Sequence, residues 1–261
     1  MKKRPIIVVG TIAVAFVVLF LAGPAVHVDT HVAPITLPVD LDRYLAQSEA
    51  RFPDIVPGTE KKIIWANAAK TKTPLSIVYV HGWTATRQET APLCDQIAVQ
   101  LGANLFYTRL TGHGRSGTAM AEATVNDWLN DVAEAYEIGK RLGDRVIVIG
   151  NSTGSTLATW LAEQPNTEAV AAYVWMSPNY GPKDKRSEIL AWPWGEQLAR
   201  LMVGAEFSRL PSSALDATYY TYRFPSKALL PMMGLVKFVR ASPVETIHAP
   251  VLVIYSPADN T

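Results

Sequence analysis

The chain has 261 residues, enough for one large α/β domain, and 24 basic against 23 acidic side chains leave a net charge of +1. This balance provides no basic surface, so nucleic acid is not an expected partner. A single cysteine, Cys94, excludes an intrachain disulfide and any metal site built from several cysteines. No metal site and no cofactor-binding loop is predicted.

The amino terminus predicts a membrane helix. Three cations at positions 2–4 precede an uncharged, mostly apolar run from Ile6 to Val26. At about 1.5 Å per residue this run reaches across a bilayer core of about 30 Å, and it is longer than the apolar region of a signal peptide. We expect residues 1–26 to anchor the chain, with its domain on the non-cytoplasmic side (periplasmic or extracellular), or to be a signal whose cleavage leaves a secreted protein.

Residues 27–60 predict a linker with several prolines and one short helix that lies on the main domain. Strands and helices then alternate over residues 61–261. The strands are too apolar to have a face in water, which is typical of a mostly parallel sheet with helices on both sides. Strands are predicted at 61–67, 76–80, 104–110, 146–149, 171–176 and 250–255, and helices at 90–101, from Thr124 to Gly143, and from Ser155 on.

The alternation breaks down between the last two predicted strands, at residues 178–248. This insertion is rich in aromatic residues and methionine. A loop of this length needs its own structure, and its place after the carboxyl end of a strand predicts a helical lid. Its apolar residues are expected to form the wall of a pocket for an acyl or otherwise apolar substrate, the core of the lid itself, or both.

The segment Gly150-Asn151-Ser152-Thr153-Gly154 lies between a predicted strand and a predicted helix. Such a turn forces the serine into a strained conformation that lifts its hydroxyl clear of the sheet, and a side chain two residues before or after it would collide with backbone. The alternative interpretation is a glycine-rich turn with an incidental serine.

Other polar residues also follow predicted strands, at the edge where ligands gather in parallel sheets. His81-Gly82-Trp83 follows the second strand, His113 lies in a glycine-rich loop after the third, and Asp259 follows the last. We expect the two histidines to hold their loops by hydrogen bonds rather than to act as bases. For Asp259 the alternative is an ordinary aspartate in a turn.

Taken together, these motifs resemble the α/β-hydrolase family, in particular its lidded esterases, lipases and monoacylglycerol-lipase-like members. The resemblance covers about residues 60–261. It implies an α/β-hydrolase fold, Ser152 as the nucleophile and Asp259 as the acid that orients a histidine. It also implies an oxyanion hole formed by the backbone N–H groups of Trp83 and Thr153.

One feature departs from the family pattern, in which the catalytic histidine follows the acid. All five histidines precede Asp259, namely His27, His31, His81, His113 and His248. We therefore expect the catalytic histidine beyond Thr261 in a longer natural protein. These 261 residues alone are then expected to be nearly inert, because loss of a triad member costs several orders of magnitude in rate.

The predicted function is hydrolysis of carboxylic esters, either lipid-like or small acyl esters, through an acyl-enzyme. Amide, thioester or carbon–carbon bond hydrolysis by the same groups is an alternative that sequence does not separate from it. A second alternative is a non-catalytic hydrolase-like protein that binds an apolar ligand or a partner through its lid.

Overall fold

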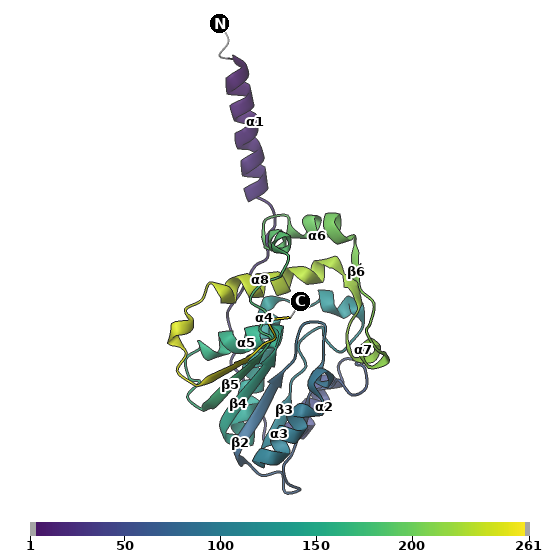
Figure 1. Cartoon of the computed structure of the whole chain (residues 1–261), viewed down its shortest axis with the longest axis vertical. Coiled ribbons are helices and arrows are strands. Elements are labelled where there is room, and N and C mark those ends of the chain that lie inside the picture. The colour runs from purple at the N-terminus through teal and green to yellow at the C-terminus, as the bar shows by residue number, and fades with distance from the viewer. Residues whose placement is uncertain (1–3, 259–261) are drawn as a thin grey trace.

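The structure, a computed structural model, describes residues 4–258, with side chains described from Gly10 onward. Within these residues a six-stranded sheet has the order β1-β3-β2-β4-β5-β8. Strand β1 is antiparallel to β3, and the other pairs are parallel (Figure 1). The strands are β1 (Lys62–Ile64), β2 (Thr73–Val80), β3 (Asn104–Tyr107), β4 (Gly143–Asn151), β5 (Val170–Met176) and β8 (Val251–Ile254).

Helices cover both faces of this sheet, as expected for parallel strands that are apolar on both sides. Along β2, Ile77 and Tyr79 are buried with residues of α3 (Leu93–Leu101), which begins three residues later than predicted. Val78 and Val80 point to the other face, where they join a larger cluster. That cluster is completed by α4 (Val125–Leu142), α5 (Thr153–Ala162) and α8 (Leu229–Arg240).

Residues 178–248, which we call the lid, lie between β5 and β8. They contain α6 (Gly195–Val203), α7 (Ala214–Tyr219), α8 and a hairpin of β6 (Glu206–Ser208) and β7 (Arg223–Pro225). In Figure 1 the helices α6 and α8 lie above the carboxyl ends of the strands. The lid therefore contains a small antiparallel sheet as well as the helices that were predicted.

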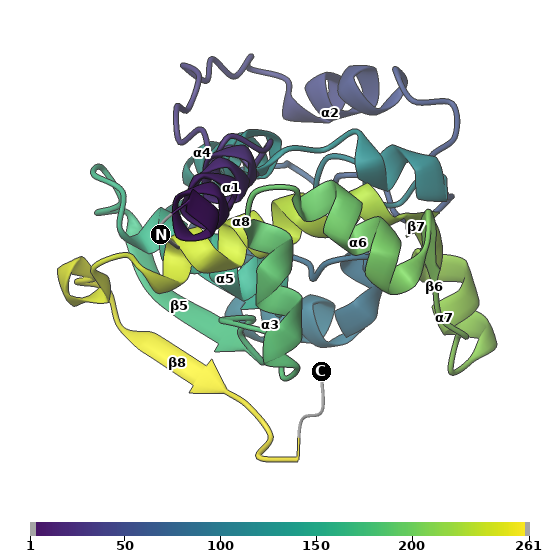
Figure 2. The ribbon, with the colours of Figure 1, turned by 90° about the horizontal axis from the view of Figure 1, so that it is seen from above.

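Helix α2 (Leu41–Glu49) lies on the outer side of the domain, beyond α4 (Figure 2). Leu41 and Leu45 are buried in the main core. At its last turn, Glu49 accepts hydrogen bonds from Nε and Nη2 of Arg109, both at 2.8 Å. The exposed fractions of the two side chains are 4% for Arg109 and 10% for Glu49, so this ion pair is removed from water.

The prediction of an amino-terminal transmembrane helix is wrong. No helix among residues 4–258 combines the length and the apolar character that a bilayer requires. Helix α1 (Arg4–Leu21) has 18 residues, which span about 27 Å at about 1.5 Å per residue and fall short of the hydrocarbon core. The predicted run extended to Val26, but the helix stops before Gly23 and Pro24.

Replacing Glu49 by glutamine tests the ion pair between α2 and the loop after β3. The change leaves the buried guanidinium of Arg109 without its counter-charge, so we expect the free energy of unfolding to fall by about 3 kcal/mol. Urea denaturation monitored by circular dichroism measures this. The control is Asp184→Asn, which breaks a solvent-exposed pair with Arg186 on the lid and is expected to have a much smaller effect on the free energy of unfolding. If both variants lose the same free energy of unfolding, the buried ion pair does not stabilise the attachment of α2.

Candidate active site

Ser152 occupies the turn between β4 and α5, residues 150–154, which we call the elbow, and it stands at the N-cap position of α5. Its backbone angles are φ 50° and ψ −117°, a conformation that residues other than glycine rarely adopt. The neighbouring strand restrains this turn, because the N–H of Ser152 donates to the carbonyl of Met176 at the end of β5, at 2.9 Å. Strain of this kind persists only where neighbouring contacts enforce it.

Both glycines of the turn stand where a side chain has no room. A Cβ on Gly150 would lie 2.6 Å from the carbonyl carbon of Gly154. A Cβ on Gly154 would lie 2.0 Å from the carbonyl oxygen of Val80, the last residue of β2. The first turn of α5 therefore touches the end of the neighbouring strand, and only glycine permits this approach.

Two backbone N–H groups near Ser152 have no partner. Thr153 begins α5, where N–H groups are unpaired and the helix dipole favours negative charge. Trp83 lies in the loop after β2, and this loop meets the elbow, since a Cβ on Gly82 would stand 3.2 Å from Cβ of Ser152. Within residues 4–258 neither the N–H of Trp83 nor that of Thr153 has a hydrogen-bond acceptor. Both are free to bind an oxyanion.

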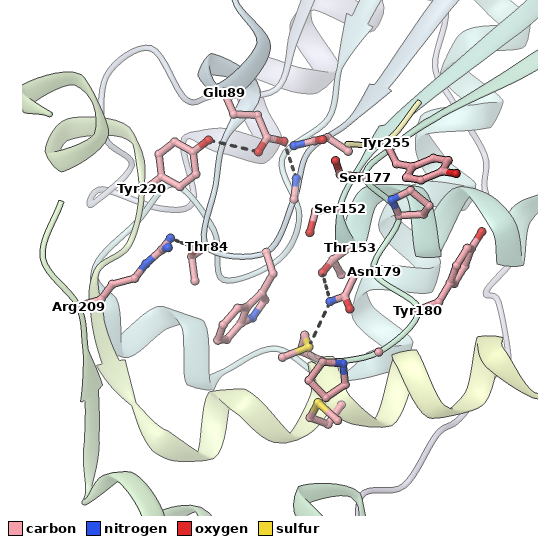
Figure 3. A pocket seen from close by; sticks show the side chains of 18 of the residues that line it. Thr84, Glu89, Ser152, Thr153, Ser177, Asn179, Tyr180, Arg209, Tyr220 and Tyr255 are labelled. Atoms are coloured by element: carbon pink, nitrogen blue, oxygen red, sulfur yellow. Dashed lines mark hydrogen bonds between the residues drawn. The ribbon is translucent and has the colours of Figure 1, made fainter. Parts of the chain in front are cut away.

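Ser152 lines a cavity of about 980 Å³ between the strand ends and the lid (Figure 3). The strand ends supply polar groups and backbone, whereas the lid supplies much of the apolar wall. Phe224 and Met233 belong both to this wall and to the buried core of the lid. The two uses expected for the apolar residues of the lid therefore occur together. Other lining residues include Gly82, Trp83, Thr84, Glu89, Asn151, Thr153, Ser177, Asn179, Tyr180, Phe207, Arg209, Tyr220, Met232 and Tyr255.

Comparison with known proteins identifies the family. The alpha/beta hydrolase family model matches residues 77–261, well over half of the chain. The chain belongs to the alpha/beta hydrolase family. The resemblance inferred from its motifs is confirmed.

Proteins named as lipases or lipolytic enzymes are among those to which this α/β hydrolase is similar. It is 36% identical over 90 residues to the thermostable monoacylglycerol lipase of Bacillus sp. (strain H-257), a match that covers 34% of the chain and 36% of that enzyme. The chain thus matches only about a third of that relative's length. A structure from work on two metagenome-derived lipolytic enzymes, LipS and LipT, is similar with a TM-score of 0.61 and 22% identity, over 78% of both chains.

A soluble variant of monoglyceride lipase from Saccharomyces cerevisiae, solved with a substrate analog, is also similar. Its TM-score is 0.57 at 14% identity, and the match covers 80% of this chain and 81% of that chain. At these identities the likeness shows the fold alone. It agrees with the predicted mostly parallel sheet flanked by helices.

His81 and His113 are buried next to each other, with ring centroids 5.1 Å apart, and neither lines the cavity. Nε2 of His81 accepts the N–H of Leu110 at 3.0 Å, so Nδ1 carries the proton and donates to the carbonyl of Gly82 at 2.9 Å. Nδ1 of His113 contacts the carbonyl of Thr111 at 3.1 Å. Burial lowers the pKa of His81 to about 4 and holds the pKa of His113 well below its usual value. Both rings are neutral and join adjacent loops.

Not every predicted site residue can be placed. Asp259 lies outside the described residues, so its role as the orienting acid stays a prediction. His27, His31 and His248 are exposed, and none of the described residues that line the cavity is a histidine. The general base of the predicted triad is therefore not among the described residues of the pocket.

The structure adds a residue that the sequence did not point to. Glu89 lines the cavity beside the loop of Trp83, although it lies in a polar stretch with no motif around it. The removal of its carboxyl from water raises the pKa of Glu89, against the opposing effect of the hydrogen bonds from Tyr79 and Gly82. A half-buried acid at this place had no signal in the sequence, because its partners come from distant segments.

The neutral state of His81 makes a testable contribution to stability. Because folding lowers the pKa from about 6.5 to about 4, the contribution is present above pH 6.5 and is lost as the pH falls towards 4. We expect the stability advantage of the wild type over His81→Gln to shrink by about 2 kcal/mol between pH 7 and pH 5.

Urea denaturation of both proteins at the two pH values measures this difference. The comparison with the variant is needed because burial raises the pKa of Asp131 to about 6, which acts in the opposite direction on total stability. A difference between the proteins that stays constant with pH contradicts a neutral, buried His81.

Proposed function

We propose that this α/β hydrolase is a serine hydrolase that cleaves carboxylic esters, lipid-like or small acyl esters, through an acyl-enzyme. The observation that carries the proposal is the placement of Ser152. Its side chain belongs to the wall of a lidded cavity, its backbone is held at positive φ, and the unpaired N–H groups of Trp83 and Thr153 lie on the two segments that flank it. An incidental serine in a glycine-rich turn needs none of these features.

The proposed reaction has two similar steps, in which Ser152 is first acylated and the acyl-enzyme is then hydrolysed. Oγ of Ser152 attacks the ester carbonyl carbon while a histidine takes its proton, and the resulting oxyanion accepts hydrogen bonds from the N–H groups of Trp83 and Thr153. Each such donor is worth about 3 kcal/mol in the transition state. The ester C–O bond then breaks and the alcohol leaves with the proton from the histidine. Water then attacks the acyl carbon while the histidine takes its proton, the bond between the acyl carbon and Oγ breaks, and the carboxylic acid leaves as the proton returns to Oγ of Ser152.

The proton acceptor in this scheme is the histidine expected beyond Thr261, oriented by Asp259. A serine hydroxyl is a poor nucleophile without such a base. Experiments on catalysis therefore use the protein at its natural length. If that protein lacks a histidine at the cavity, binding of an apolar ligand by a non-catalytic protein becomes the better account.

The apolar wall supports esters with a hydrocarbon acyl group as the substrate class. Phe207, Phe224, Met232 and Met233 line the cavity from the lid. Trp83 lines it from the loop after β2, residues 81–84, which we call the oxyanion loop. Flexible methionine side chains adapt to chains of different shape. The names of the relatives, a monoacylglycerol lipase and lipolytic enzymes, point in the same direction.

A fluorophosphonate probe tests the nucleophile. We expect the probe to label the full-length protein at Ser152, because phosphorus is attacked only by an activated hydroxyl, and we expect Ser152→Ala to abolish labelling. Ester hydrolysis is expected to fall by at least about 10⁴-fold in the same variant. Mass spectrometry of the labelled peptide and hydrolysis of p-nitrophenyl esters provide the measurements.

Ser213→Ala is the matched control. Ser213 also begins a helix, α7, but it lies on the exposed side of the lid and does not line the cavity. We expect it to retain labelling and activity. Labelling that survives Ser152→Ala places the nucleophile elsewhere and ends the proposal.

A further inference from the structure

A carboxyl group stands behind the oxyanion loop, and the proposed reaction does not use it. Glu89 belongs to a short 3₁₀ helix, Arg87–Thr90, that follows this loop. Its Oε1 accepts the N–H of Gly82 at 2.6 Å and the hydroxyl of Tyr79 at 2.6 Å. Gly82 immediately precedes Trp83, so Glu89 holds the peptide next to the proposed oxyanion donor.

The second oxygen of Glu89 faces the serine and the lid. Oε2 of Glu89 and Cβ of Ser152 each stand 3.2 Å from the point where a Cβ on Gly82 would lie. The hydroxyl of Tyr220, on the lid, donates to Oε2 at 3.4 Å (Figure 3). Figure 3 shows Glu89 and Tyr220 on the same side of the cavity, with their polar ends directed at each other. The side chain of Asn151, the residue before the nucleophile, also hydrogen-bonds Glu89.

The loop that Glu89 holds is strained and needs several contacts. Thr84, two residues after Gly82, has φ 62°, which is a steric outlier for a β-branched residue. A second contact from the lid restrains it, since the N–H of Thr221 donates to the carbonyl of Thr84 at 2.8 Å. Without such restraints a backbone of this kind relaxes, and the proposed oxyanion donor at Trp83 is displaced with it.

We propose that Glu89 is a positioning residue: its carboxyl fixes the oxyanion loop against the nucleophile elbow and joins both to the lid through Tyr220. This inference rests on the proposed function. Glu89 touches no reacting atom, so its effect is on the geometry of the donor at Trp83. The carboxyl is suited to this task because it has two oxygens: Oε1 accepts from the loop and Oε2 accepts from the lid. A side chain with one polar atom cannot bind both segments.

Variants at position 89 separate positioning from simple stability. We expect Glu89→Asp and Glu89→Ala to lower kcat by about 100-fold with KM changed less than about threefold, because a displaced oxyanion donor weakens the transition state rather than substrate binding. Glu89→Gln is expected to retain kcat within about fivefold. Its amide oxygen still accepts from Gly82, and its amide group donates to the hydroxyl of Tyr220.

Asp95→Asn is the matched control. Asp95 lies on α3 and accepts the hydroxyl of Tyr107 at 2.7 Å, so it is another half-buried carboxyl paired with a strand tyrosine, but it lies outside the cavity. We expect Asp95→Asn to lower the melting temperature and leave kcat unchanged. If Glu89→Asp and Glu89→Ala behave like Asp95→Asn, Glu89 is only structural and the proposal is wrong.

An NMR measurement that does not depend on turnover separates the positioning role of Glu89 from the proposed serine-hydrolase activity. The amide proton of Gly82 is expected far downfield in a ¹⁵N–¹H NMR spectrum, because it makes a 2.6 Å hydrogen bond to a carboxyl group, and to move upfield in Glu89→Ala. If the wild type is not labelled by the fluorophosphonate probe, the proposed function fails whatever this spectrum shows. A Gly82 signal that does not move in Glu89→Ala overturns the positioning role alone.

The link to the lid is tested with two neighbouring tyrosines. Tyr220→Phe removes the hydroxyl that donates to Glu89, whereas Tyr222→Phe removes a hydroxyl that hydrogen-bonds Asp216 instead. We expect Tyr220→Phe to lower kcat about fivefold in the wild type and to have no effect in Glu89→Ala, while Tyr222→Phe changes kcat in neither. Equal effects of the two tyrosine variants, or additivity of Tyr220→Phe with Glu89→Ala, overturn the link.

Discussion

The close approach of α5 to the end of β2 is the constraint on which the site depends. Strands β2 and β4 are parallel neighbours, with Val80 opposite Gly150. Because Gly154 has no side chain, the first turn of α5 comes against the carbonyl of Val80. The residue that follows β4 and the loop that follows β2 therefore meet at one point, although about 70 residues of chain separate them. This contact brings Ser152 and the unpaired N–H groups of Trp83 and Thr153 into one region.

The elbow and the oxyanion loop differ in how they are supported. Ser152 is fixed by the sheet, through Met176 at the end of β5. Trp83 instead packs edge-on against Phe224 of the lid, with ring centroids 5.0 Å apart. The lid contributes to both sides of the site, because the N–H of Asn179, its second residue, donates to the carbonyl of Ser152 at 3.2 Å. The nucleophile is therefore held by the sheet and by the first residues of the lid, whereas Trp83 contacts the part of the lid that carries Phe224.

The lid residues that form the pocket wall also stabilise the lid. Phe224 and Met233 are buried in the lid core and also line the cavity. A substitution that changes the shape of the pocket there also leaves a void or an overpacked contact in the lid, which costs about 1–3 kcal/mol. Substrate range and lid stability are therefore coupled in this protein.

Local patterns in the sequence were sufficient to predict the architecture. Apolar strands, the glycines around Ser152 and the histidine loops are short-range features, and they led to the correct family and to a sheet covered on both faces. The membrane helix was wrong because hydropathy continued to Val26 while Gly23 and Pro24 ended the helix. An apolar composition does not show where a helix ends, whereas a glycine followed by a proline does.

Glu89 could not be predicted for a different reason. Its segment, Arg87–Thr90, is polar and is typical of a solvated turn. Its burial depends on Tyr79 of β2 and on Tyr220, which is 131 positions away along the chain. Only the folded lid brings that tyrosine over the oxyanion loop. Functional residues that act through tertiary hydrogen bonds leave no local spacing to detect.

A carboxyl group beside an oxyanion hole raises a problem of charge, and its surroundings offer the solution. An ionised Glu89 would place a negative charge near the oxygen that becomes negative in the transition state, and the two charges would repel. Removal from water raises the pKa of Glu89, so a negative charge is disfavoured there. Fixed donors also meet both oxygens of the carboxyl: Oε1 accepts from the N–H of Gly82 and the hydroxyl of Tyr79, and Oε2 accepts from the hydroxyl of Tyr220. Burial and these donors together reduce the repulsion that the carboxyl exerts on the oxyanion.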